Sequence, residues 1–199
     1  MVYLKEGKNI ARELGIQDAE LELVLKKCEQ DSVPHKEALY KSYYGFIKGV
    51  VRRYVNDYHV MEELVNDSFV KIFNNLNTFK APGYSSDIEQ SFKGWVAKIA
   101  SRTAIDFLRK KKMNFLQEEP SENHFPEQAP SGVHTSEVKD ILSLLNQLPE
   151  VQKTVFNLYE IEGFSHEEIA RLLQISENVC RVYLSRAKSK LKALYIKHF

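Results

Sequence analysis

The spacing of the apolar residues limits this chain to helical structure. In residues 61–76, apolar side chains recur at steps of three and four residues, the period of an amphipathic α-helix. Residues 92–112 repeat the pattern, and Ser91 is the expected N-cap of that helix. Residues 19–29 and 36–55 predict two more helices. Because no segment shows the strict alternation of a strand, the predicted fold class is all-α.

One polar segment divides the chain. Residues 113–137 contain three prolines and five glutamates, with no lysine or arginine and no apolar period. Such a composition buries too little apolar surface to offset the entropy of ordering, so it predicts a flexible linker. We therefore expect an N-terminal extension at 1–17, a domain at 18–112, the linker, and a second small domain at 138–199.

Charge is distributed unevenly around this linker. The net charge of the whole chain is +1, but residues 34–112 carry 14 basic and 8 acidic side chains, whereas residues 113–137 have a net charge of −5. Two basic blocks that flank an acidic strip are typical of a nucleic-acid-binding protein. The two cysteines lie far apart and form no metal or redox motif, which favours a reducing cytoplasm. No apolar run is long enough to insert into a membrane.

The second domain predicts a helix-turn-helix motif. After a helix at about 136–146, three more helices follow, and residues 173–175 form the short corner between the last two. Residues that favour helix ends are Pro149 at the first position of a helix running to about Glu160, Gly163 at its end, Ser165 and Glu168 as a capping box, and Ser176 as the N-cap of a final helix extending to about residue 195.

The final helix has one apolar stripe and one basic side. Cys180, Leu184, Ala187 and Leu191 recur at steps of four, three and four residues, and we expect Cys180 to be a core residue rather than a redox sensor. A helix that is covered on one side and basic on the other fits the DNA major groove, although a solvated basic face is the alternative. The candidate DNA-binding residues are Asn178, Val179, Arg181, Val182, Ser185, Arg186 and Lys188.

A second basic surface is predicted on the helix over 92–112. Basic residues at its end also complement the helix dipole, which is the alternative explanation. Of the nearby aromatic residues, Phe92 and Trp95 are expected in the core, whereas Tyr84 lies in a polar loop and could stack on an unpaired base. The candidate residues are Tyr84, Lys98, Arg102, Arg109 and Lys110.

The polar face of the helix over 61–76 is acidic. It carries Glu62, Glu63, Asn66 and Asp67, which DNA would repel. This cluster therefore faces either solvent or a basic protein surface, and taken alone solvent is the favoured interpretation.

Together these segments resemble a known family. EELVNDSFVKIF at 62–73, followed by FKGWVAKIASRTAIDFLRKKK at 92–112, is similar to region two of the extracytoplasmic-function sigma factors. LPEVQKTVFNLYEIEGFSHEEIARLLQISENVCRVYLSRAKSKLK at 148–192 is similar to their region four. The resemblance covers about residues 20–112 and 136–195, so most of the chain lies within it.

The resemblance implies a role for each surface. The acidic cluster would bind the clamp helices of the largest subunit of core RNA polymerase. The loop from about Phe79 to Ser91 and the helix after it would open and read the minus-ten promoter element. The final helix would read the minus-thirty-five element, and the linker would pass through the polymerase cleft. Whether an anti-sigma factor also binds is left open.

Four residues depart from the family pattern. Arg102 stands where an asparagine is usual, which puts base preference there in doubt. Gln174 replaces the usual glycine at the turn, where a positive φ would cost a residue with a side chain about 1 kcal/mol. Val179 and Val182 occupy positions that are commonly Thr and Ser, where they would contact thymine methyl groups.

Two other classes of function were weighed. A stand-alone helix-turn-helix regulator would explain the final helix, but it has no need of the acidic cluster. A nucleic-acid enzyme is disfavoured, because the six histidines are scattered and the sequence contains no paired carboxylates, phosphate loop or metal-ligand spacing. The sequence therefore predicts a cytoplasmic transcription initiation factor without catalytic residues, metal or cofactor.

Overall fold

The computed structural model describes residues 18–80, 87–110 and 143–198. These residues form helices and contain no strand, which confirms the all-α prediction. The chain divides into two compact units at Ile105, and each is described here by itself. Because α5 runs unbroken to Lys110, its last turn is described with the first unit. The predicted extension at 1–17, the predicted linker at 113–137 and Tyr84 lie outside the described residues.

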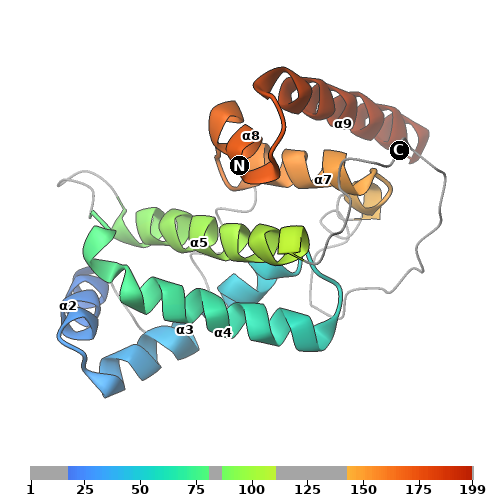
Figure 1. The fold of residues 1–199 in the computed structure, drawn as a ribbon. Helices are drawn as coiled ribbons and strands as arrows, with labels where there is room; N and C mark the ends of the chain where they lie inside the picture. The colour runs from blue at the N-terminus through green and yellow to red at the C-terminus, as the bar shows by residue number, and fades with distance from the viewer. Residues whose placement is uncertain (1–17, 81–86, 111–142, 199) are drawn as a thin grey trace. The chain divides into compact units, whose positions relative to one another are not determined.

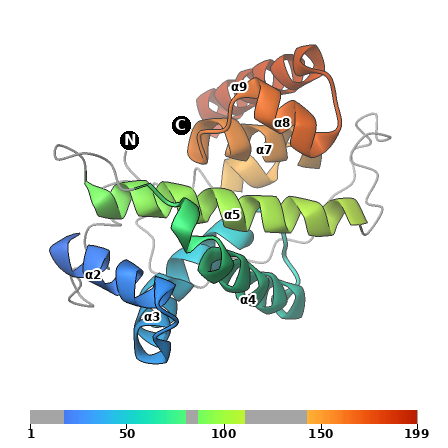
Figure 2. The same ribbon diagram turned by 60° about the vertical axis from the view of Figure 1, so that its left-hand side comes forward.

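The first unit is a bundle in which α3 packs against both α2 and α4. Figures 1 and 2 show α5 lying along the pair formed by α3 and α4. The elements are α2 (Asp18–Glu29), α3 (Val33–Val51), α4 (Tyr58–Asn74), the short 3-10 helix η1 (Leu76–Thr78) and α5 (Ile88–Lys110).

Aromatic and β-branched side chains fill the centre of this bundle. Ile47 on α3, Val65 on α4 and Phe92 on α5 are fully buried. The ring of Tyr43 meets that of Phe92 edge-on, with the ring centroids 5.0 Å apart. Such a pair contributes about 0.5–1.5 kcal/mol beyond the burial of its area. This contact joins α3 to α5. Phe92 is buried as predicted, whereas Trp95, which was also expected in the core, is half-buried.

The start of α5 differs from the sequence prediction. The helix begins at Ile88, so Ser91 lies inside it, and the backbone N–H of Gln90 donates to the carboxylate of Asp87 at 3.1 Å. Asp87 therefore caps the helix, because a carboxylate suits the positive end of the helix dipole. The earlier start also brings Glu89 within 2.5 Å of Lys93, one turn further along. The predicted loop consequently ends at Asp87 rather than at Ser91.

The second unit contains the helix-turn-helix. Its described elements are a helical stretch at residues 143–146, α7 (Glu150–Phe156), the π-helical turn η2 (Asn157–Ile161), α8 (His166–Leu173) and α9 (Glu177–His198). Both α7 and α8 pack against α9. Leu145, Leu148 and Ala187 are buried together, and Phe156 and Leu191 pack onto them.

The ends of α7 and η2 refine two predictions. Pro149 was predicted at the first position of this helix, but it is the N-cap, because its ψ of 141° is extended and α7 begins at Glu150. The helix continues as far as predicted, but its last turn widens, and the N–H of Glu162 donates to the carbonyl of Asn157 at 3.0 Å, a step of five residues. Gly163 then ends the turn with a φ of 70°, a conformation that favours glycine.

Candidate functional site

The acidic face of α4 contains two kinds of residue. Glu63 and Asp67 are exposed and lie one helical turn apart, and neither has a cationic partner among the described residues. Glu62 turns toward α3 instead. Its carboxylate forms an ion pair with Lys48 at 2.5 Å and accepts a hydrogen bond from the hydroxyl of Tyr44. The side chains of Lys48 and Glu62 are only 29% and 27% exposed, so this pair lies at the edge of the helix contact.

Asn66 is also held by α3. Its side-chain oxygen accepts a hydrogen bond of 3.0 Å from the hydroxyl of Tyr40. The Tyr40 ring packs against Phe69 with centroids 4.3 Å apart, which places the tyrosine between the core and the acidic face. Periodicity had indicated that Asn66 lies on the polar face, but it gave no signal for Tyr40, Tyr44 or Lys48, because these lie on another helix.

Proton affinities follow from this geometry. The hydrogen bond from Lys48, and then that from Tyr44, lower the pKa of Glu62. The hydrogen bond that Lys48 donates to Glu62 raises the pKa of Lys48, and the hydrogen bond that Tyr44 donates to Glu62 raises the pKa of Tyr44. All three shifts favour a charged Glu62–Lys48 pair and a neutral tyrosine near neutral pH.

The basic residues of α5 lie at different depths. Arg102 and Lys110 are exposed, whereas Lys98 is half-buried. Arg109 is exposed and forms an ion pair with Asp106 of the same helix at 3.0 Å. Phe79 packs against both Phe92 and Trp95, with ring centroids 5.2 and 5.6 Å apart. Phe92 and Trp95 lie in the first turns of α5, so these contacts fix the chain at Phe79 against the start of that helix.

The turn between α8 and α9 has the predicted local geometry. Ser165 and Glu168 form a complete capping box. Gln174 has a φ of 55°, which confirms the positive φ expected where the family usually has glycine. The N–H groups of Gln174 and Ile175 both donate to the carbonyl of Ala170, which ends α8. The N–H of Val179 donates to the hydroxyl of Ser176 at 3.3 Å, so this predicted cap is also confirmed.

The two sides of α9 are as predicted. Cys180, Leu184 and Ala187 are buried and Leu191 is partly buried. Val179 and Val182 are 38% and 45% exposed, so their methyl groups lie on the solvent side of the helix. The polar candidates Asn178, Arg181, Ser185, Arg186 and Lys188 are also exposed.

Two of these candidates have partners in their own chain. Arg181 pairs with Glu177 at 3.1 Å, both on α9. Lys188 pairs with Glu160 at 2.6 Å and lies over the ring of Tyr159, with 5.8 Å from Nζ to the ring centroid. Lys188 therefore links α9 to η2, which the sequence did not indicate.

Cys180 is a buried thiol beside a histidine. His166 Nδ1 lies 3.4 Å from its sulfur, and the His166 ring stacks on Tyr159 with centroids 4.4 Å apart. Burial raises the pKa of Cys180 and lowers that of His166. A neutral, inaccessible thiol is unreactive, in agreement with the core role predicted for Cys180.

The described residues contain no group of three or more His, Cys, Asp or Glu side chains placed to hold a metal ion. None of their helices combines the length and the apolar character needed to cross a membrane.

These observations define a class of protein: an all-α protein of two units, one carrying an acidic helix face and the other a helix-turn-helix with a basic last helix. Comparison with known proteins identifies the family. The family model of Sigma-70 region 2 matches residues 39–113, and that of Sigma-70 region 4 matches residues 139–191.

Curated relatives agree with this assignment. The RNA polymerase sigma factor YlaC of Bacillus subtilis (strain 168) is 31% identical over 165 residues, which cover 78% of this chain and 89% of YlaC. The ECF RNA polymerase sigma factor SigM of the same organism is 24% identical over 161 residues, covering 80% of this chain and 94% of SigM. The chain belongs to the ECF group of the sigma-70 family.

A solved structure is also similar. It is the sigma factor RpoE in complex with the anti-sigma factor NepR from Bartonella quintana. The sequence identity is 18% and the TM-score 0.49, and the match covers 80% of this chain and 95% of that one.

Proposed function

We propose that this sigma factor binds core RNA polymerase through the outer face of α4 and directs it to promoter DNA through α5 and α9. The contact on the polymerase would be the clamp helices of its largest subunit. The role is one of binding and positioning in the cytoplasm, and the chain itself would catalyse no reaction.

The observation that carries the proposal is the pair of unpartnered acids on α4. Glu63 and Asp67 are like charges one turn apart, an arrangement that destabilises an isolated helix by a few tenths of a kcal/mol. Among the described residues, no cation forms an ion pair with either carboxylate. A basic surface on a partner would offset the repulsion, and complementary charge also steers association and fixes register.

Glu62 and Asn66 belong to the same surface but have a different role. Their bonds to Lys48, Tyr44 and Tyr40 hold them against α3. A side chain that is already oriented loses little conformational entropy on binding. We therefore propose that Glu63 and Asp67 supply the charge, and that Glu62 and Asn66 present a rigid edge beside it.

On the DNA side, α9 would enter the major groove upstream. The exposed methyl groups of Val179 and Val182 suit contact with thymine, and Arg181 suits a base edge or a phosphate. On α5, Lys98, Arg102, Arg109 and Lys110 would act where the strands separate, with Tyr84 as a stacking residue.

Charge reversal on α4 tests the polymerase contact. Glu63→Lys combined with Asp67→Lys should reduce affinity for core polymerase at least about a hundredfold, because like charges facing each other at an interface cost several kcal/mol. Titration of labelled protein with core polymerase measures the affinity, and circular dichroism checks that helix content is unchanged. The matched control is Glu22→Lys with Glu29→Lys, the same charge change at exposed positions of α2.

Two outcomes separate the alternatives. Loss of binding in the α4 variant alone supports the proposed surface. Unimpaired binding by the α4 variant would count against it. If the wild-type chain itself failed to bind core polymerase, a stand-alone regulator would become the better hypothesis.

A further inference from the structure

His166 lies where three elements of the second unit meet. It is the first residue of α8, which packs against both η2 and α9. Its ring stacks on that of Tyr159 in η2, with the ring centroids 4.4 Å apart and the planes inclined by 23°. Its Nδ1 atom lies 3.4 Å from the sulfur of Cys180, a fully buried residue of α9. One imidazole therefore contacts both of the elements against which α8 packs.

The charges on η2 and α9 make a proton on this ring unfavourable. Arg181 and Lys188 bring positive charge near His166, and Glu177 brings the opposing negative charge. Glu177, however, already pairs with Arg181, and Glu160 of η2 already pairs with Lys188. An imidazolium would therefore add a positive charge to a cluster in which both carboxylates already have a cation.

The charged residues of α8 itself are held in the same way. Glu167 pairs with Arg171, one turn further along the helix. The carboxylate of Glu168 accepts the N–H of Ser165 in the capping box. Each acid of α8 is therefore bonded to a partner other than His166.

These surroundings favour the neutral imidazole. Burial, and then the charge of Arg181, lowers the pKa of His166 below its ordinary value of 6.5. Lys188, whose Nζ lies 5.8 Å from the centroid of the stacked Tyr159 ring, acts in the same direction. In an imidazolium both ring nitrogens are donors, so Nδ1 would then meet the Cys180 sulfur only as a donor to a weak acceptor.

We propose that His166 makes the helix-turn-helix sensitive to pH: its neutral ring holds α8 against η2 and α9, and a proton on the ring loosens this junction. Because α9 packs on α8, the loosening also weakens binding to upstream DNA. The effect on DNA rests on the function proposed for α9, whereas the effect on the fold does not.

The direction of the effect follows from linkage between protonation and folding. The unfolded chain takes up a proton on His166 at a higher pH than the folded unit does, because the pKa is lowered only in the folded unit. The stability of the second unit is therefore complete above pH 6.5 and falls as the pH decreases through the interval between the two pKa values.

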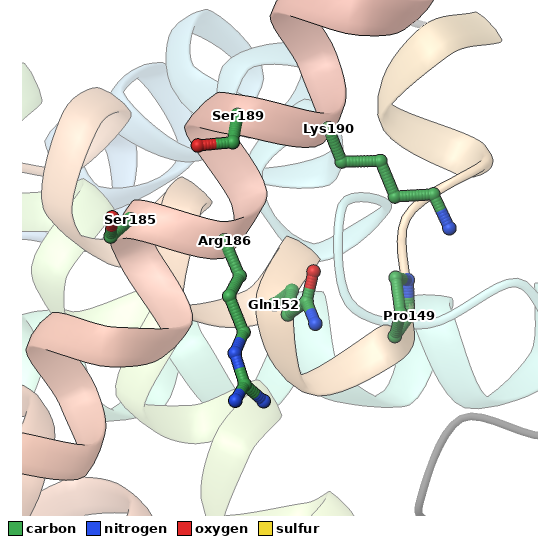
Figure 3. A pocket seen from close by; sticks show the side chains of 6 residues that line it. All are labelled: Pro149, Gln152, Ser185, Arg186, Ser189 and Lys190. Carbon is green, nitrogen blue, oxygen red and sulfur yellow. The ribbon is translucent and has the colours of Figure 1, made fainter.

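Other side chains of this unit give little competing signal. His166 is the one histidine of residues 143–197, and histidine is the side chain whose charge ordinarily changes between about pH 5 and 8. Figure 3 shows the charged ends of Arg186 and Lys190 pointing apart at a hollow between α7 and α9 whose other lining residues are uncharged. That surface contains no histidine, so a change of DNA binding in this range would report the junction at His166.

Amide hydrogen exchange in the full chain tests the effect on the fold. Protection of the α8 and α9 amides, corrected for the intrinsic exchange rate, gives the opening equilibrium between about pH 5 and 8. The slope of its logarithm against pH counts the protons taken up on opening. The wild type should take up a fraction of one proton below pH 6.5. His166→Phe keeps an aromatic ring against Tyr159 but cannot titrate, so this uptake should be lost.

The chain offers matched controls. His59→Phe removes an exposed histidine of the first unit and should leave the slope for α8 and α9 unchanged. Fluorescence of Trp95, the single tryptophan, reports unfolding of the first unit and should depend on pH identically in the wild type and in His166→Phe. His166→Gln, which also cannot titrate, replaces His166→Phe if the phenylalanine variant does not fold.

A direct titration and a binding assay complete the test. The His166 ring protons of the folded wild-type chain, followed by NMR, should titrate below pH 6.5. With core polymerase and a promoter duplex selected from a random upstream library, the wild type should lose affinity as the pH falls below 6.5, and His166→Phe should lose less.

The contrary outcomes are distinct. Titration of the His166 ring at or above pH 6.5 in the folded chain would overturn the proposal, as would equal pH slopes of amide protection in the wild type and the His166 variants. Equal loss of DNA affinity in the wild type and His166→Phe would show that the loosening does not reach α9. If wild-type binding did not depend on the upstream sequence at any pH, the function proposed for α9 would fail instead.

Discussion

Lys48 on α3 and Glu62 on α4 form an ion pair of 2.5 Å that ties the two helices together at the edge of the acidic face. Tyr44, one turn before Lys48, donates its hydroxyl to the other oxygen of the same carboxylate. The acidic face of α4 is therefore divided into an inner carboxylate, bonded within the chain, and the outer pair of Glu63 and Asp67.

Glu62→Gln should lower stability in a way that depends on pH. The pKa of Glu62 in the folded protein lies below 4.5, the ordinary value of the group. Its contribution is therefore complete above pH 4.5 and is lost as the pH falls through the folded pKa. Urea unfolding should show a lower free energy of unfolding for the variant than for the wild type at pH 7. This difference should shrink as the pH falls toward 3. A difference in the free energy of unfolding that stays constant with pH would show that the charge of Glu62 does not contribute to stability.

Gln174→Gly should stabilise the second unit by up to about 1 kcal/mol. Gln174 has a φ of 55°, where a Cβ atom is strained and glycine is not. Gln174→Ala is the control, because alanine keeps the Cβ and should give no gain. Hydrogen exchange of the α8 and α9 amides measures the effect locally. If these amides were equally protected from exchange in Gln174→Gly and Gln174→Ala, the explanation by backbone strain would be contradicted.

Ser165→Ala should cost about 1 kcal/mol, the usual value of an N-cap. The Ser165 hydroxyl accepts from the N–H of Glu168 at 3.2 Å, and the Glu168 carboxylate accepts from the N–H of Ser165 at 2.9 Å. Loss of the cap exposes the first turn of α8, so amide exchange should accelerate there first. Ser165→Asp, which retains an acceptor, should keep most of the protection.

Arg181→Ala and Arg102→Ala should impair different steps of initiation. Arg181 lies on the exposed side of α9, so its loss should reduce transcription from an intact promoter and matter much less where the upstream element is already mutated. A base-edge contact is worth about 1–3 kcal/mol of discrimination. Run-off transcription on the two templates measures this difference. Equal loss on both would mean that Arg181 contacts only phosphate.

Arg102→Ala should leave upstream recognition intact and slow strand opening. Arg102 is exposed on α5, in the basic stripe proposed to act where the strands separate. A template melted in advance at the minus-ten element should restore its activity, and permanganate footprinting follows the opening directly. Normal opening by this variant would remove Arg102 from the proposed surface.

The sequence by itself determined which segments are helical, the starts of α8 and α9 and the two sides of α9, whereas α3 and α4 each begin three residues earlier than predicted. These features are local: a stripe at steps of three and four residues, a serine followed three residues later by glutamate, and a positive φ at Gln174 all involve neighbours within two turns. The Asp87 cap shows the limit, since Ser91 was an equally good cap by residue type. The helix instead starts after Asp87, and Glu89 then lies beside Lys93.

Only the tertiary structure decided which polar side chains remain available to partners. Periodicity gives the direction of a side chain about its own helix axis, but not where the next helix lies. Glu62 and Glu63 therefore looked alike in the sequence, although α3 binds the first and leaves the second exposed. For the same reason Lys188 is held by Glu160, whereas Arg186 has no such ion pair among the described residues. Ion pairs between helices depend on how the helices pack, because charges attract strongly only within a few ångströms and water screens them beyond that.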